Sequence, residues 1–201
     1  MYPLFESVHI RNGQIKNAVY HEKRFANSYF AYFNNRPAYS LFENISLPEL
    51  DLDINYKLRI AYGLKDKKWQ ITPYTNSLPS TLQLVYDDTI TYPHKFNDRE
   101  HLNSLYQNRK NADDVLIICK GQITDTSYCN ILFTDGSTIF TPSTPLLKGT
   151  CRARLLAENN IQTKLITPAD IQDYRHFQLI NALNDFDASR WMPIKNIYQP
   201  K

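Results

Sequence analysis

The sequence predicts an α+β fold in which helices and mainly antiparallel strands form separate blocks along the chain. Three observations support this class. Phe25, Tyr29 and Phe33 recur every four residues and form the apolar stripe of a helix. Three strand-like segments with many β-branched and aromatic residues follow that helix, and their order suits an antiparallel meander. A second block of strands and short helices fills the C-terminal half, where glycine and proline mark the turns.

The N-terminal block should begin with a hairpin over residues 4–20. Asn12-Gly13 is the favoured pair for a type I′ turn, and short alternating runs flank it. A helix should then run from about Tyr20 to Asn34, because the apolar stripe covers this range.

Residues 35–53 are ambiguous, since two prolines would break any long element there. The three segments expected to form the meander are YKLRIAYG, KWQITPY and TLQLVY. A second helix should begin at Asp98, a good N-cap, and turn Leu102, Leu105 and Tyr106 inward.

Four further strands are expected in the C-terminal half: DDVLIICKG, QITDTS, NILFTDGSTIFTP and, last, the buried HFQLINAL. Turns with glycine at Lys120-Gly121 and Asp135-Gly136 should join the first three. Two helix starts are also predicted, at Gly149-Thr150 and at Thr167-Pro168, where proline suits the first helical position.

The length of 201 residues allows one domain or two small ones, and a core of this size needs no disulfide or metal. A boundary fits best near residues 88–95, where DDTITYPHK joins the two blocks. We therefore expect a small first domain over residues 1–90 and a larger second domain over residues 91–201.

Composition excludes several classes of protein. A hydrophobic content of 42% and a charged content of 21% are globular values. The net charge of +3, from 23 basic and 20 acidic residues, is too balanced for a nucleic-acid binder. No apolar run reaches the roughly 18 residues of a membrane span, and the N-terminus lacks the apolar region of a signal peptide. Three cysteines without metal-like spacing favour a reducing cytoplasm.

Two segments could bind an anion. Gly149, Thr150 and Cys151 lie at an expected helix start, where outward N–H groups and the helix dipole favour phosphate. Arg24 lies in HEKRF on the same helix face as His21, and its rigid guanidinium could bind an anion at the edge of the core. Each pattern also has an ordinary explanation, namely a capped surface helix and a solvated arginine.

Lys95 and Asp125 are the candidates for chemistry. Lys95, in PHKFNDR, could simply be solvated, but a lysine becomes a nucleophile when it is partly desolvated near another cation or a cofactor. Asp125 lies inside residues 121–142, which we expect to form a buried hairpin. A buried carboxylate needs a cationic or donor partner. That partner could be a structural arginine, unless Asp125 lies on an exposed edge strand.

Taken in order, these segments resemble the class IV aminotransferase family, the fold type IV pyridoxal-phosphate enzymes with a D-amino-acid aminotransferase-like fold. The resemblance runs through LFESV, HEKRF, HKFNDR, GQITDTSYCNILF, IFTPSTPLLKGTCR, LINAL and MPI. In the family, a lysine and a helix precede a buried strand, then Thr-Glu, Asn-hydrophobic-Phe and Thr-Pro. The corresponding positions here are Lys95, Thr124-Asp125, Asn130, Phe133 and Thr141-Pro142.

The resemblance implies that the second domain binds pyridoxal 5′-phosphate and that no metal takes part. Lys95 would form the Schiff base with this cofactor. Asp125 stands where the family has a glutamate that pairs with the pyridine nitrogen, and it is shorter by one methylene, roughly 1.5 Å of reach. The phosphate would be held by Arg24, Gly149, Thr150, Cys151, Asn181 and Ala182.

Two reactions are open within this family, and Lys95 would be the general base in both. The motifs look most like 4-amino-4-deoxychorismate lyase, which releases 4-aminobenzoate and pyruvate. The alternative is an aminotransferase acting on D-amino or branched-chain amino acids. A non-catalytic family member is a third reading, suggested by the aspartate at position 125. The resemblance also implies a homodimer acting on a small amino substrate, without nucleic acid or membrane partners.

Overall fold

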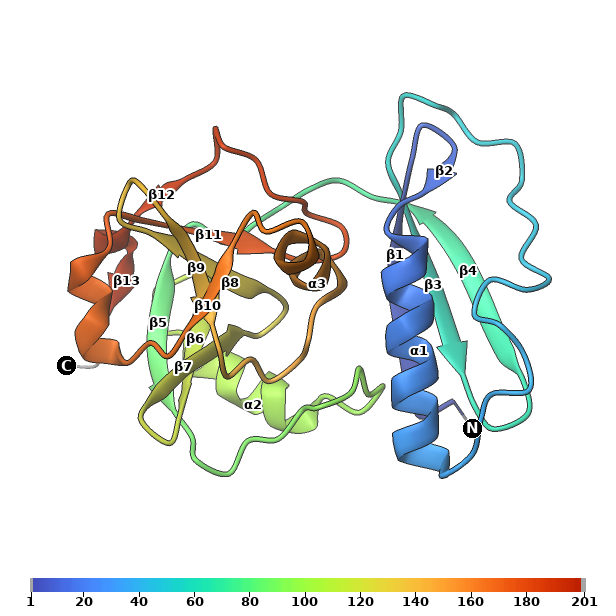
Figure 1. Cartoon of the computed structure of the whole chain (residues 1–201), viewed down its shortest axis with the longest axis horizontal. Helices are drawn as coiled ribbons and strands as arrows, with labels where there is room; N and C mark the ends of the chain where they lie inside the picture. The colour runs from blue at the N-terminus through green and yellow to red at the C-terminus, as the bar shows by residue number, and fades with distance from the viewer. Residues whose placement is uncertain (1, 200–201) are drawn as a thin grey trace. The chain divides into compact units, whose positions relative to one another are not determined.

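The computed structural model describes residues 2–199, which form two compact units (Figure 1). The first unit is the chain up to Asn76 with His94–Asp98, and the second is Ser77–Pro93 with the chain from Arg99 onward. The division thus comes earlier than the expected boundary at residue 90. The segment around residue 95 returns to the first unit through strand-like pairing, since Phe5 N donates to Lys95 O at 3.0 Å.

The first unit is an antiparallel sheet with one helix. Its strand order is β2-β1-β3-β4, with β1 at Leu4–Arg11, β2 at Gln14–Ile15, β3 at Tyr56–Tyr62 and β4 at Lys67–Pro73. Asn12 and Gly13 have φ values of 52° and 68°, which confirms the predicted type I′ turn. The helix α1, Ala18–Phe33, confirms the predicted helix and ends at Asn34 in a left-handed cap.

The core of the first unit is formed by α1 and one face of this sheet, along which the helix lies (Figure 1). Leu4 and Val8 of β1 pack there with Phe25 and Tyr29 of α1. Successive strand residues alternate between the two faces, so Glu6 points into the same apolar layer and is fully buried. A carboxylate in that layer requires charged or hydrogen-bonding partners.

The second unit contains two sheets, ordered β13-β5-β6-β7 and β10-β9-β8-β11-β12. Their strands are β5 Leu82–Tyr86, β6 Asp114–Cys119, β7 Gln122–Thr126, β8 Asn130–Thr134, β9 Ile139–Pro142, β10 Gln162–Lys164, β11 His176–Ile180, β12 Met192–Pro193 and β13 Ile197–Tyr198. The predicted meander is wrong at its third segment, because β5 pairs in parallel with β6 and does not join β3 and β4. An almost continuously buried strand such as β5 is typical of a parallel pair covered on both faces.

Residues 121–142 are divided between two hairpins, and both predicted turns are present, with Gly136 at positive φ in the turn between β8 and β9. β6 and β7 form one hairpin, with Lys120 and Gly121 at positive φ in its turn. After β7 the chain changes sheets, and β8 pairs with β9 and β11. Asp125 therefore lies at the end of one sheet, close in sequence to the start of the other.

The helices of the second unit follow the predictions closely. α2, Glu100–Gln107, has Arg99 as its N-cap, one residue after the predicted Asp98, and α3, Thr150–Ala157, has Gly149 as its N-cap. The element after Thr167 is a 3-10 helix, η1 Pro168–Asp173, and a second one, η2 Ile194–Asn196, lies near the C-terminus. Within residues 2–199, no helix has both the length and the apolar character needed to cross a membrane.

Candidate active site

A buried carboxylate joins α1 to β1 in the first unit. Glu6 Oε1 accepts a hydrogen bond from Arg24 Nε at 2.8 Å, and Oε2 accepts one from Arg24 Nη2 at 2.5 Å. The same Oε2 lies 2.6 Å from His21 Nδ1. Because His21 and Arg24 are three residues apart on α1, both reach the strand. The bidentate pair fixes the plane of the Arg24 guanidinium.

This cluster satisfies its own charges. Burial alone would raise the pKa of Glu6, but the charge of Arg24 and the hydrogen bond from His21 outweigh burial and lower the pKa to about 2. Burial lowers the pKa of His21. At neutral pH, Glu6 is therefore ionised and Arg24 is its cation, while a neutral His21 donates its Nδ1 proton.

Lys95 lies beside the start of β1 in the same unit. Its Nζ is 4.8 Å from the centroid of the Phe5 ring, and Arg59 Cζ is 4.3 Å from the same centroid. After burial and the nearer charges, the positive charge of Lys95 also contributes to the lowered pKa of His21. The first unit thus places the predicted nucleophile within electrostatic range of the α1 face that carries Arg24.

Asp125 is the corresponding buried acid of the second unit. Its Oδ1 accepts a hydrogen bond from Asn130 Nδ2 at 2.7 Å, and its Oδ2 accepts one from Leu147 N at 2.9 Å. Both donors are neutral amides. Burial therefore dominates and raises the pKa of Asp125 to about 6, although the two amides and the charge of Arg152 act in the opposite direction.

The predicted phosphate-binding amides form the first turn of α3. A Cβ atom at Gly149 would lie 2.0 Å from Asn130 Oδ1, so no larger residue fits at this N-cap. Arg152 is buried and folds back toward β9, where its Nη2 donates to Pro142 O at 2.9 Å. The start of the helix therefore presents backbone N–H groups and the positive end of its dipole, the arrangement that favours an anion.

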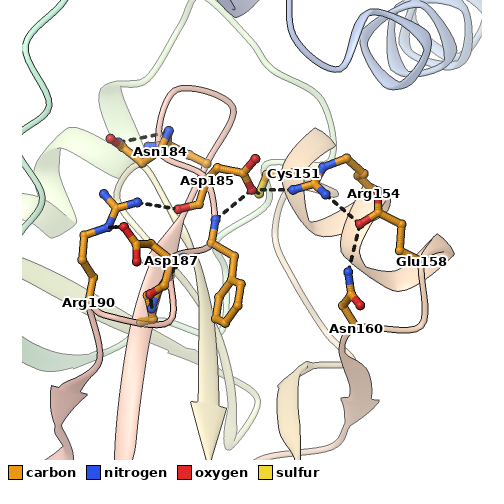
Figure 2. A network of polar contacts seen from close by, with 11 residues as sticks. Cys151, Arg154, Glu158, Asn160, Asn184, Asp185, Asp187 and Arg190 are labelled. Atoms are coloured by element: carbon orange, nitrogen blue, oxygen red, sulfur yellow. Dashed lines mark hydrogen bonds and ion pairs between the residues drawn. The ribbon is translucent and has the colours of Figure 1, made fainter.

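The loop after β11 is attached to α3 by an acidic residue. Figure 2 shows Asp185 between the side chains of Cys151 and Arg154. Cys151 Sγ donates to Asp185 Oδ1 at 3.3 Å, and Arg154 Nη2 donates to the same oxygen at 2.5 Å. This contact holds the loop that contains Asn181 and Ala182 against the predicted phosphate-binding helix.

The predicted residues are divided between the two units. The first contains Arg24 and Lys95, and the second contains Asp125, Gly149, Thr150, Cys151, Asn181 and Ala182. The side-chain oxygen of Asn181 closes its own turn, accepting from Leu183 N at 2.9 Å and Asn184 N at 3.0 Å. Its Nδ2 donates to Cys129 Sγ at 3.2 Å, so both polar atoms of the side chain have partners in the fold, and a phosphate contact at this loop would come from backbone groups. The role of each residue toward a ligand stays a prediction.

Sequence reasoning missed two residues that organise these clusters. Glu6 carried a detectable signal, because an acid at the alternating position between Leu4 and Val8 must be buried with them. The only sequence signal at Asn130 was its position in the family-like Asn-hydrophobic-Phe motif. Its contacts to Asp125 and Leu147 depend on the change of sheet after β7, which the sequence pattern does not predict.

Comparison with known proteins identifies a family and several proteins that this chain resembles. The family model described as amino-transferase class IV matches residues 3–197. An uncharacterized protein of Haemophilus influenzae is 37% identical over 187 residues, which cover 92% of this chain and 99% of that protein. A crystal structure described as "a putative 4-amino-4-deoxychorismate lyase" from Haemophilus somnus is 32% identical, with a TM-score of 0.81 over 92% of this chain and 98% of that one.

A more distant solved structure confirms the fold. An aminotransferase from Brucella abortus, bound to the cofactor PLP, is 15% identical, with a TM-score of 0.70 over 94% of this chain and 79% of that one. The predicted α+β, fold type IV architecture is thus confirmed, and family and fold agree with the predicted cofactor, pyridoxal phosphate. With the family model matching nearly from end to end, the chain belongs to the class IV aminotransferase family of enzymes.

Proposed function

We propose that this protein is a pyridoxal-phosphate-dependent lyase that converts 4-amino-4-deoxychorismate into 4-aminobenzoate and pyruvate, a reaction of folate synthesis. The observation that carries the proposal is the match to the Haemophilus somnus protein described as such a lyase, at 32% identity over 98% of that chain. The match extends over 92% of this chain, so the likeness is not limited to one motif.

The donor set of the second unit fits pyridoxal phosphate. Asp125 is a fully buried acid whose direct donors are neutral amides, so it suits a protonated ring nitrogen as its cationic partner. The first turn of α3 suits a phosphate group. When bound, the cofactor supplies an electron sink that stabilises negative charge at the substrate Cα. We propose that Asp125 keeps the ring nitrogen protonated and that the α3 amides with Arg24 hold the phosphate.

Lys95 has two proposed tasks. Its ε-amine would hold the cofactor covalently, and when free it would be the base that removes the proton from the substrate Cα. The C–O bond at the neighbouring carbon then breaks, and the leaving group is enolpyruvate, which takes up a proton to become pyruvate. The ring is left as the aromatic 4-aminobenzoate. Lys95 and Arg24 both lie within electrostatic range of His21, which supports this assignment because the proposed nucleophile is then near the arginine proposed to hold the phosphate.

Transamination is the second candidate, because removal of the same proton by Lys95 begins both reactions. It is favoured by the aminotransferase among the fold neighbours. In that case Lys95 would move the same proton without departure of a leaving group, and a keto acid would be the product, with D-amino or branched-chain amino acids as substrates. A non-catalytic role would require that Lys95 form no covalent bond to the cofactor.

We further propose a cytoplasmic homodimer with a small amino compound as its substrate and no nucleic-acid or membrane partner. The balanced charge of 23 basic and 20 acidic residues supports the last point. Active sites of this family lie at a dimer interface, which supports the proposed homodimer. Sedimentation at micromolar concentration should give the mass of two chains, and an active species with the mass of one chain would contradict the proposal.

Two measurements test the function. The purified protein should be yellow, and borohydride should fix the cofactor to Lys95 in a labelled peptide; a label on another lysine would reject the assignment. Single turnover with aminodeoxychorismate should then release pyruvate and 4-aminobenzoate and restore the original spectrum. Conversion of the cofactor to its amine form by alanine or a branched amino acid, without turnover of aminodeoxychorismate, would instead establish an aminotransferase.

A further inference from the structure

The side chain of Asn130 connects the two halves of the proposed cofactor site in the second unit. Its Nδ2 donates to Asp125 Oδ1 at 2.7 Å and to Leu147 O at 2.9 Å. Leu147 N donates to Asp125 Oδ2 at 2.9 Å, so the three residues form a closed ring of hydrogen bonds. Asn130 is 6% exposed, and Asp125 is 5% exposed, so water competes little for these bonds.

The orientation of the Asn130 amide follows from its surroundings. Both N–H groups of Nδ2 meet acceptors, whereas Oδ1 faces Gly149, where an added Cβ would lie 2.0 Å away. Exchanging the oxygen and nitrogen would turn Oδ1 toward the Asp125 carboxylate and the Leu147 carbonyl, which are both acceptors. One planar amide thus sets the position of Asp125 on one side and of the α3 N-cap on the other.

We propose that Asn130 is a positioning residue that couples the ring-binding carboxylate to the phosphate-binding turn of α3. This inference rests on the proposed function, because it concerns the same cofactor site. Displacement of Leu147 or Gly149 moves the Asn130 amide, and the amide moves Asp125. Recognition of the ring and recognition of the phosphate are therefore expected to be energetically linked through this single side chain.

Three substitutions separate this role from simple packing. Asn130→Ala removes the donor to Asp125 and the contact with Gly149. Asn130→Asp keeps the shape but turns acceptors toward the Asp125 carboxylate, and two adjacent carboxylates raise one another's pKa. Gly149→Ala creates the collision with Oδ1, which the double variant Asn130→Ala/Gly149→Ala relieves. Asn111→Asp, at an exposed asparagine of the second unit, is the control for the change in net charge.

The primary measurement is the affinity of the apo-protein for pyridoxal 5′-phosphate and for pyridoxal, which lacks the phosphate, from pH 5 to 8. The wild-type protein should bind pyridoxal phosphate much more tightly than pyridoxal, with affinity lost at acid pH as Asp125 gains a proton. In Asn130→Ala and Asn130→Asp, the ratio of the two affinities should fall by about tenfold or more, and the acid midpoint should move upward. Asn111→Asp should match the wild type.

The double-variant cycle gives an independent result. Gly149→Ala alone should weaken pyridoxal phosphate binding severely, whereas in the Asn130→Ala background the same change should cost about tenfold less. If Asn130→Ala does not fold, Asn130→Ser, which retains one donor, takes its place. An unchanged affinity ratio, an unchanged acid midpoint and additive effects of Asn130 and Gly149 would overturn the inference. A wild-type protein that binds no pyridoxal phosphate would instead reject the proposed function itself.

Discussion

Each unit of this protein buries one acidic side chain that matters for the proposed site, and the two acids are satisfied in opposite ways. Glu6 in the first unit has a bidentate arginine and a histidine as partners, and its pKa falls to about 2. Asp125 in the second unit accepts hydrogen bonds from two neutral amides, and its pKa rises to about 6. Burial penalises both carboxylates, so the difference comes from the charge of the partners.

This contrast distinguishes a structural acid from one that is prepared for a ligand. Glu6 pairs with a cation of its own fold, Arg24, and fixes the plane of the Arg24 guanidinium. Asp125 has good hydrogen-bond geometry, but Arg152, the cation whose charge acts on it, donates its own hydrogen bonds to Thr141 Oγ1 and Pro142 O. A protonated ring nitrogen would supply what Asp125 lacks, and it would lower the pKa of Asp125 on binding.

Breaking the first cluster should have the largest effect. Glu6→Gln leaves Arg24 without its carboxylate in a mostly buried place, which should lower the free energy of unfolding by about 3–5 kcal/mol at pH 7. Because the pKa of Glu6 is lowered, its stabilising effect is present at neutral pH and is lost as pH falls from about 4.5 toward 2. Urea denaturation of both proteins at pH 7 and pH 3 measures this. Equal stabilities at pH 7 would show that the ion pair contributes nothing.

The same kind of substitution in the second unit should have the opposite sign. The pKa of Asp125 is raised from 3.8 to about 6, so ionisation of Asp125 costs the apo-protein stability as pH rises through that interval. The full difference corresponds to about 3 kcal/mol, from which loss of one hydrogen bond subtracts about 1 kcal/mol. Asp125→Asn apo-protein should therefore be more stable than the wild type at pH 8, by thermal or urea unfolding, and show no such gain at pH 4.

Activity should separate these two effects of Asp125→Asn. An uncharged amide no longer favours a protonated ring nitrogen, so turnover of the loaded enzyme should fall by orders of magnitude although the apo-protein is stabilised. Normal turnover would show that the carboxylate is structural, like Glu6. A destabilised apo-protein at pH 8 would show that the two amide hydrogen bonds outweigh the penalty of burial.

The next effect concerns Arg24 as a ligand for phosphate. Arg24→Ala should weaken binding of pyridoxal phosphate by about 2 kcal/mol or more, through loss of a charge-assisted contact. Glu6→Gln retains the guanidinium but releases its plane, so the folded variant should lose less affinity than Arg24→Ala. Equilibrium binding to the two apo-variants provides the comparison. Equal losses would mean that orientation by Glu6 matters as much as the charge itself.

Sequence reasoning succeeded where local signals decide the structure. The turn at Asn12-Gly13, the stripe of α1 and the glycine N-cap of α3 all follow from backbone preference or spacing. It failed where long-range pairing decides, as for β5, whose apolar run fits a meander and a buried parallel strand equally well. The family-like motifs singled out Asp125 and Lys95 as candidates, but the partners of Asp125 depend on how the chain changes sheets after β7.

The smallest effect is expected at the exposed edge of the second unit. Asp185 links the 181–187 loop to Cys151 and Arg154, but its side chain is 54% exposed, and exposed ion pairs contribute only about 0–1 kcal/mol. Asp185→Asn should therefore leave the free energy of unfolding nearly unchanged. It should weaken pyridoxal phosphate binding by less than about tenfold, because only the loop beside α3 loosens while Gly149 and Asn130 keep the helix start in place. Added salt should diminish the small difference in binding further. A loss as large as that of Arg24→Ala, measured in the same titration, would mean that the loop holds the phosphate more firmly than the helix start does.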